Sequence, residues 1–119
     1  MRVQPSEMWH VALTVGGPGV DLGELRAALE RLSEERPFLL SARYAQERVE
    51  VRYWEEAVCL ADAAALALRL WGEHRGTAGL PHWAVVGLEI VDRETFQLRA
   101  AEGNGGAPAL VPAGGIRPF

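Results

Sequence analysis

Three side chains on two predicted strands have the types that acid–base or anion-binding chemistry requires: His10, Glu50 and Arg52. His10 lies in WHVALTV (9–15), and the other two lie in RVEVRYW (48–54). A histidine near its ordinary pKa of ~6.5 can take a proton from a substrate. An arginine beside it can hold a carboxylate or a developing oxyanion. If the two strands are neighbours, His10 would be the base and Arg52 the oxyanion partner in one cleft, with Glu50 beside them.

The other candidates for chemistry have simpler interpretations. Cys59 lies among acidic residues in EEAVCLAD, which would raise the pKa of its thiol, so we expect a small buried hydrophobe. His74 and His82 are eight residues apart, with Gly and Pro between them, and this is not the close spacing of metal ligands. We therefore expect no metal site and no cofactor. His74 is expected to cap the end of a helix.

A Gly-rich turn before the first predicted helix is a further candidate for ligand binding. Such turns can present backbone amides to an anion, although neither GxGxxG nor GK[ST] is present. The segment TVGGPGVDLGELRAALERL resembles the first strand, Pro-Gly loop and helix of ACT-type regulatory modules, which bind amino acids at a dimer interface. The resemblance covers roughly residues 9–32 and implies a ligand-binding loop containing Gly17, Gly19 and Asp21. The alternative is a plain turn followed by a helix cap.

The elements that must position these residues follow from periodicity. Alternating or continuous apolar runs bounded by Gly and Pro predict strands. Apolar residues at helical spacing after an Asp that can cap the first turn predict helices. The order is strand, helix, strand, strand, helix, strand, at residues 9–15, 22–35, 38–44, 48–54, 61–74 and 83–91. This order predicts an α+β ferredoxin-like βαββαβ fold, a four-stranded antiparallel sheet with two helices on one face. We expect residues 1–100 to form this single domain.

The C-terminal part of the sequence has few apolar residues. DRETFQLR (92–99) is expected to turn and to add a short extra strand. Residues 101–119 are dominated by Gly, Ala and Pro and are expected to form an irregular tail. The second helix carries apolar residues on more than one face, which favours a second partner. The tail could also cover that helix through its spaced apolar residues Leu110, Val111, Ile116 and Phe119.

With both helices on one face, the other face of the sheet would be open. Strand alternation predicts that it is polar but carries tryptophans, and such a surface tends to meet a ligand or partner. The residues expected there for ligand or partner contact are Trp54, Trp83 and Arg43, and the same face would carry His10, Thr14, Leu39, Ser41, Glu50, Arg52, Val85 and Glu89.

Composition limits the classes of function. The net charge is −4, and all twelve basic residues are arginines interleaved with glutamates, which argues against a nucleic-acid-binding face. No apolar run is long enough for a membrane span, and the first residues do not resemble a signal peptide. One cysteine and a residue usage typical of GC-rich genomes favour the cytoplasm of a bacterium.

These observations predict a small cytoplasmic bacterial protein without enzymatic activity, because no motif assembles a nucleophile, a base and oxyanion donors. It would be a homodimer, through the open sheet face or the second helix, that binds a small molecule or a protein partner. The alternative is a small dimeric ferredoxin-like enzyme that uses His10 and Arg52 beneath the open face. A third class, a component of a larger complex, predicts exposed apolar surface around Trp54, Trp71 and Trp83.

Overall fold

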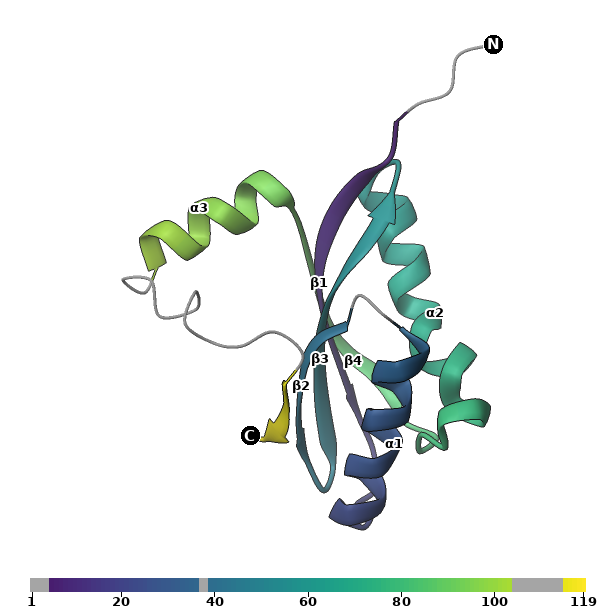
Figure 1. The fold of residues 1–119 in the computed structure, drawn as a ribbon. Helices are drawn as coiled ribbons and strands as arrows, with labels where there is room; N and C mark the ends of the chain where they lie inside the picture. Colours follow the sequence, from purple (N-terminus) through teal and green to yellow (C-terminus); the bar gives the residue numbers. More distant parts are fainter. Residues whose placement is uncertain (1–4, 37–38, 104–114) are drawn as a thin grey trace.

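The computed structural model describes residues 5–36, 39–103 and 115–119 of the chain. They form an α+β fold of five strands and three helices (Figure 1). In chain order the elements are β1 (Glu7–Gly16), α1 (Leu22–Glu35), β2 (Leu39–Ala45), β3 (Arg48–Ala57), α2 (Leu60–Ala78), β4 (Ala84–Asp92), α3 (Arg93–Gly103) and β5 (Gly115–Pro118).

The strands form one mixed sheet in the order β4-β1-β3-β2-β5. β1 pairs antiparallel with β3 and β4, and β2 pairs antiparallel with β3. β5 pairs with β2 in the parallel sense. The α+β class is therefore as predicted, but the four-stranded antiparallel ferredoxin-like layout is wrong, because the sheet has a fifth, parallel strand and the fold a third helix.

The helices lie on both faces of the sheet. α1 and α2 cover one face. α3, which follows β4 in the chain, lies on the opposite face (Figure 1). The core lies between the sheet and the first two helices, and its fully buried side chains include Val11, Leu13, Leu25, Leu29, Leu32, Val49, Val51, Tyr53 and Leu70. We call the face that carries α3 the outer face.

The first helix forms where its sequence predicts it. Asp21 is the N-cap, and its carboxylate accepts a 3.0 Å hydrogen bond from the backbone amide of Glu24, which satisfies a free donor of the first turn. Leu25, Leu29 and Leu32 form the buried stripe. The helix ends at Glu35, and Arg36 is extended, as expected for a residue before a proline. The predicted range of residues 22–35 is confirmed.

The second helix is longer than predicted and ends at Ala78 instead of residue 74. Gly79 terminates it in the left-handed conformation with φ 77°, and its amide donates to the carbonyl of Arg75 at 3.0 Å. Cys59 is the N-cap residue and is exposed, so the expectation that it is buried is wrong. It lies in the bend between β3 and α2, where the chain has left the sheet.

The segment after β4 is a helix, so the expected short strand at residues 92–99 is wrong. Asp92 accepts a 2.7 Å hydrogen bond from the backbone amide of Thr95, which caps the start of α3. The end of the tail is also ordered, because β5 extends the sheet and Ile116 packs against the core. Leu110 and Val111 lie outside the described residues. A domain boundary at residue 100 stays a prediction, although α3 runs across it.

A β-bulge in β4 corrects the predicted composition of the outer face. The register with β1 shifts between Thr14 and Val15, which pair with Gly87 and Val85, so Val86 is an extra residue. The extra residue inverts the alternation, and Val85 packs against the core instead of lying on the outer face with Glu89. Trp83 is also buried in the core, so its predicted place on the open face is wrong.

Candidate functional site

A pocket lies on the outer face where β4, β1 and β3 meet α3. In the register of the sheet, His10 of β1 stands between Trp54 of β3 and Val91 of β4. Two residues further along β1, Ala12 stands between Arg52 and Glu89. The pocket has a volume of about 170 Å³ and is lined by His10, Arg52, Glu89, Val91, Phe96, Arg99 and Ala100. α3 thus supplies three of the seven lining residues.

Three aromatic rings pack together beside this pocket, and two of them, those of His10 and Phe96, line it. The ring of His10 lies 4.3 Å from that of Phe96 and 5.1 Å from that of Trp54, and the last two are 5.0 Å apart. Two of the three contacts are edge-to-face, the arrangement that aromatic quadrupoles favour. Phe96 therefore attaches the first turns of α3 to the sheet, and His10 is left only 7% exposed.

Burial gives the histidine an unusual protonation state. Desolvation, together with the positive charge of Arg52, lowers the pKa of His10 to about 4, against the smaller opposing effect of the negative charge of Glu89. The imidazole is therefore neutral at physiological pH. A neutral imidazole has one donor and one acceptor for hydrogen bonds, but its affinity for a proton is low.

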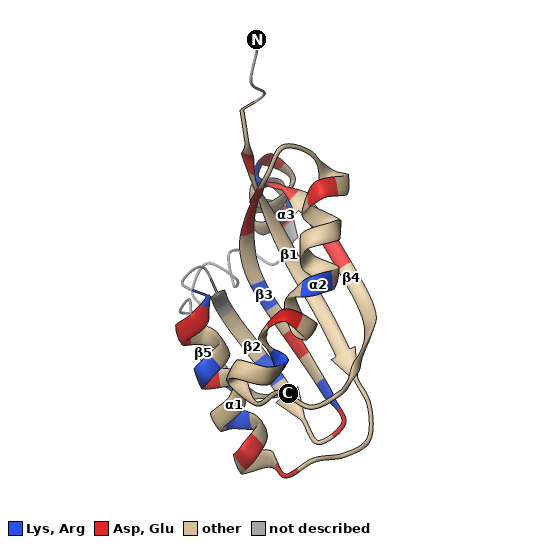
Figure 2. Ribbon diagram, turned by 90° about the vertical axis from the view of Figure 1, so that its right-hand side faces the viewer, with Lys and Arg blue, Asp and Glu red and all other residues tan. Residues whose placement is uncertain are grey.

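Two arginines bring positive charge to the pocket. The Nε of Arg52 donates a 3.1 Å hydrogen bond to Glu50, and Nη1 of Arg99 lies 3.1 Å from Oε2 of Glu89. These pairs are largely exposed and contribute little to stability, but they orient the guanidinium groups. A guanidinium has five N–H donors, so one such pair leaves donors for a bound anion. Basic and acidic residues are interspersed on the molecule (Figure 2).

Of the three residues predicted for acid–base or anion-binding chemistry, the structure brings two together and places the third beside them. His10 and Arg52 line the pocket, as adjacent strands predict, whereas Glu50 contacts Arg52 and is not part of the lining. Their predicted roles in catalysis stay predictions. Phe96 and Arg99 were missed because they belong to α3, and the only local signal was Asp92 followed by an acidic first turn.

The residues predicted as a ligand or partner surface do not form one site. The ring of Trp54 packs against two residues that line the pocket, His10 and Phe96, but Trp54 is not part of the lining. Arg43 lies on β2, where its guanidinium stacks on the Phe119 ring at 5.1 Å. Trp83 is in the core, parallel to Trp71 at 6.4 Å, so neither provides the exposed surface that the larger-complex alternative predicts.

The Gly-rich loop has structural contacts of its own. The amides of Gly17 and Val20 donate to the carbonyls of Glu47 and Gln46, in the turn between β2 and β3. Asp21 is occupied as the cap of α1. Gly19 faces the same turn. These contacts satisfy the description of a turn and a helix cap, and the ligand-binding role of Gly17, Gly19 and Asp21 stays a prediction.

Comparison with known protein families identifies a family for this chain. The family model described as a domain of unknown function (DUF8830) matches residues 8–108. The chain belongs to this family. All seven pocket residues lie inside the DUF8830 region, whereas β5 lies outside it. No curated protein matches the chain.

In the described ranges no group of three or more His, Cys, Asp and Glu side chains is placed to hold a metal ion. Within the same ranges, no helix has both the length and the apolarity needed to cross a bilayer.

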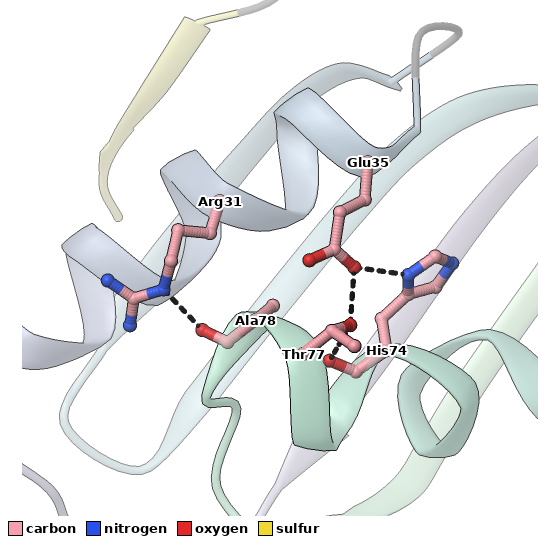
Figure 3. Close-up of polar contacts among 5 residues, drawn as sticks. All are labelled: Arg31, Glu35, His74, Thr77 and Ala78. Atoms are coloured by element: carbon pink, nitrogen blue, oxygen red, sulfur yellow. Dashed lines mark hydrogen bonds and ion pairs between the residues drawn. The ribbon is translucent and has the colours of Figure 1, made fainter.

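A second polar cluster joins the two helices of the DUF8830 core (Figure 3). Oε1 of Glu35 in α1 accepts a 2.7 Å hydrogen bond from the Thr77 hydroxyl and lies 2.6 Å from Nδ1 of His74, both in α2. Nε of Arg31 donates to the carbonyl of Ala78 at 2.7 Å. His74 thus contacts α1 instead of capping its own helix as expected. The Thr77 and His74 hydrogen bonds lower the pKa of Glu35.

Replacing Thr77 by valine should raise the pKa of Glu35 toward its ordinary value, because the hydroxyl is the largest cause of the lowering. A lowered carboxyl pKa stabilises the fold above the ordinary pKa of Glu, and this contribution is lost as the pH falls through the folded-state pKa. Carboxyl-carbon NMR of Glu35 measures the change. Thr77→Ser keeps the hydroxyl and should keep the low pKa. Equal titrations of Thr77→Val and wild type would contradict the assignment.

Proposed function

We propose that the chain is a homodimeric, non-enzymatic module that binds a small organic anion in the pocket between the outer face and α3. The observation that carries this proposal is the joint lining of one pocket by two guanidinium groups, those of Arg52 and Arg99, and by an aromatic wall. Guanidinium groups bind carboxylates in a planar, bidentate way, and the aromatic wall suits an apolar body.

The size of the pocket limits the ligand. Its volume is about 170 Å³, and a cavity of roughly 150 Å³ accommodates one benzene molecule. The ligand class is therefore a carboxylate on a body about the size of one ring. Glu89 also lines the pocket, and its pairing with Arg99 at 3.1 Å keeps the pocket from being strongly cationic before the ligand binds.

The lowered pKa of His10 favours a ligand-binding role over the enzymatic alternative. A general base works best when its pKa is near the working pH, and the pKa of His10 is lowered to about 4. The neutral ring instead offers a hydrogen bond and an aromatic surface to a ligand. The bacterial cytoplasm remains the proposed location, on the basis of the single cysteine and the residue usage of the chain.

Benzoate is a suitable probe, because it carries one carboxylate on one ring. We expect benzoate to shift the NMR signals of His10, Phe96 and Arg99, and benzamide, which has the same shape without the charge, to bind at least tenfold more weakly. Arg52→Gln and Arg99→Gln should each weaken benzoate binding by roughly tenfold or more.

The matched control is Arg26→Gln, because Arg26 lies on α1 on the other side of the sheet and pairs only with Glu30 among the described residues. This variant should bind benzoate like wild type. The proposal fails if millimolar benzoate leaves the pocket signals unchanged, or if benzamide binds as well as benzoate.

A further inference from the structure

The two edge strands of the sheet differ in length and composition. β5 has four residues and ends in a proline, whereas β4 is long; among the described strands, β5 pairs only with β2 and β4 only with β1. β4 is nine residues long, contains neither a proline nor a basic residue, and leaves Val86 56% exposed and Leu88 36% exposed. A long apolar edge strand presents unpaired backbone groups that recruit another strand unless something shields them.

An exposed apolar residue of α2, Leu68, lies on the same side of the molecule as the β4 edge. We call β4 and the Leu68 side of α2 together the flank. α2 packs on β1, β3 and β4, while α1 packs on β2 and β5, so α2 lies over the β4 side of the sheet (Figure 2). His74 and Thr77 face α1. At 100° per residue, Leu68 lies on the opposite side of α2, away from α1 and toward the β4 edge. Leu68 is 53% exposed, and its neighbours on that side are three small residues, Ala61, Ala64 and Gly72, together with Arg75.

The described end of the tail does not cover this flank. β5 and Phe119 lie at the other edge, where the amide of Phe119 donates to the carbonyl of Tyr44 at 3.0 Å.

We propose that β4 and the Leu68 side of α2 form the interface between two copies of this chain, related by a two-fold axis, with the two sheets joined edge to edge. This inference rests on the homodimeric state in the proposed function and assigns it a surface. The surface shares β4 with the ligand pocket, whose lining includes Glu89 and Val91, but Leu68 and Val86 are not part of that lining.

The sequence of β4 fits antiparallel pairing with itself. A two-fold axis at Leu88 sets Glu89 opposite Gly87 of the second copy, and both positions face the outer side of the sheet. The bulge at Val86 limits this regular pairing to the residues next to the axis, because beyond the bulge Val85 faces the core whereas Val91 faces the outer side. Within this pairing no acidic residue faces another, and the Leu88 side chains of the two copies cover one another.

The dipole of α2 also fits a second, antiparallel copy of itself, because antiparallel packing opposes the two helix dipoles. At 100° per residue, Arg75 of the last turn lies roughly 20° from Leu68, whereas Asp62 of the first turn lies roughly 120° from it, so the contact includes the basic residue and not the acidic one. The small residues Ala64 and Gly72 allow the two helices to approach closely.

The flank is large enough for such a dimer. Nine residues of strand and nineteen of helix each extend roughly 30 Å. A face of that length that includes one strand and one helix buries on the order of 1,000 Å² in total between two copies, which is the lower limit for a specific interface.

Sedimentation velocity of the full chain tests the proposal. Wild type is expected to sediment as a dimer, with twice the chain mass of 13.0 kDa. Leu68→Glu and Val86→Lys should each raise the dimer dissociation constant by about 100-fold or more, because the first sets two carboxylates close together and the second places an unpaired charge against the apolar edge of the second copy. Both positions are exposed in one chain, so circular dichroism should show the wild-type fold.

The matched control is Leu98→Glu on α3, where the leucine is 55% exposed on the outer side of the sheet. This variant should remain a dimer. A monomeric wild type, a dimer that survives both flank substitutions, or a dimer that dissociates only in Leu98→Glu would each overturn the proposal. Hydrogen exchange gives an independent readout, since amides of β4 should be protected more strongly at high than at low protein concentration.

The benzoate titration separates this inference from the proposed ligand. If Leu68→Glu is monomeric and still binds benzoate, the interface and the pocket are independent and both proposals stand. If wild type is a monomer that binds benzoate, the interface fails and the ligand proposal survives without its dimer.

Discussion

Replacing Gly17 by alanine is expected to destabilise the fold by about 3 kcal/mol, through overpacking and one lost hydrogen bond. A Cβ atom at position 17 would lie 2.3 Å from Cδ1 and 2.9 Å from Nε1 of the Trp83 indole. Both distances are shorter than any non-bonded contact that a folded protein tolerates, so the indole or the loop must move.

The indole has little freedom to move. Its Nε1 donates a 2.9 Å hydrogen bond to the carbonyl of Pro18, and its ring is parallel to the ring of Trp71. Trp71 is itself held by a 2.9 Å hydrogen bond from its Nε1 to the carbonyl of Pro81. Displacing Trp83 therefore breaks a buried hydrogen bond and disturbs a packed pair of large side chains.

Denaturant unfolding of Gly17→Ala and wild type measures this effect. Gly76→Ala is the matched control, because nothing lies within 4 Å of a Cβ at position 76 in α2. In a helix, this exchange should stabilise the protein by roughly 0.5–1 kcal/mol. If Gly17→Ala unfolds within experimental error of wild type, the close approach of the loop to Trp83 is not a constraint on the fold.

The elements with strong local signals were predictable from the sequence. α1 has an Asp cap, a leucine stripe and a proline after its end, and these three signals fix its range. β1 and β3 alternate regularly, so their pairing on one outer face, with His10 near Arg52, followed from strand alternation.

The elements without local signals were not predictable. β5 is a four-residue strand containing Gly and Pro, and it exists because β2 offers it a partner. α3 contains only two large apolar side chains, Phe96 and Leu98, so it has no stripe to reveal it. The bulge at Val86 inverted the predicted faces of Val85 and Trp83, and alternation alone does not reveal a bulge.

The candidate site is built from both kinds of element, those with strong local sequence signals and those without. Its floor on β1 and β3 was predictable, because His10 and Arg52 lie on regular strands. Its wall was not, because Phe96 and Arg99 reach the pocket only through the packing of α3 on the outer face. A pocket between a sheet and a helix of weak pattern is visible only once the long-range contacts are known.

Acidification from pH 7 to pH 4 is expected to remove about 3 kcal/mol of folding stability through His10 alone. Above pH 6.5 the imidazole is neutral in both the folded and the unfolded chain, and it imposes no cost. Below that pH the unfolded chain takes up a proton at its ordinary pKa of ~6.5. The folded chain does not do so until the pH approaches about 4, so the unfolded state gains stability throughout this window.

Denaturant unfolding at several pH values measures the effect, and His10→Leu supplies the control. The leucine variant cannot titrate at this position but retains an apolar side chain against Trp54 and Phe96. Subtracting its pH dependence removes the contributions of His74, His82 and the carboxylates. The difference between wild type and variant should grow as the pH falls from 6.5 to 4. If the two curves are parallel, His10 is not held neutral by burial.

The same titration links the histidine to the proposed ligand. An anion bound between Arg52 and Arg99 would favour the charged imidazole, so the pKa of His10 should rise from about 4 toward its ordinary value when benzoate is present. Bound benzoate would then stabilise the fold more at pH 5 than at pH 7, because protonation of His10 and binding of the anion assist each other. A pKa of His10 that is the same with and without saturating benzoate would place the anion away from the ring and contradict the proposed site.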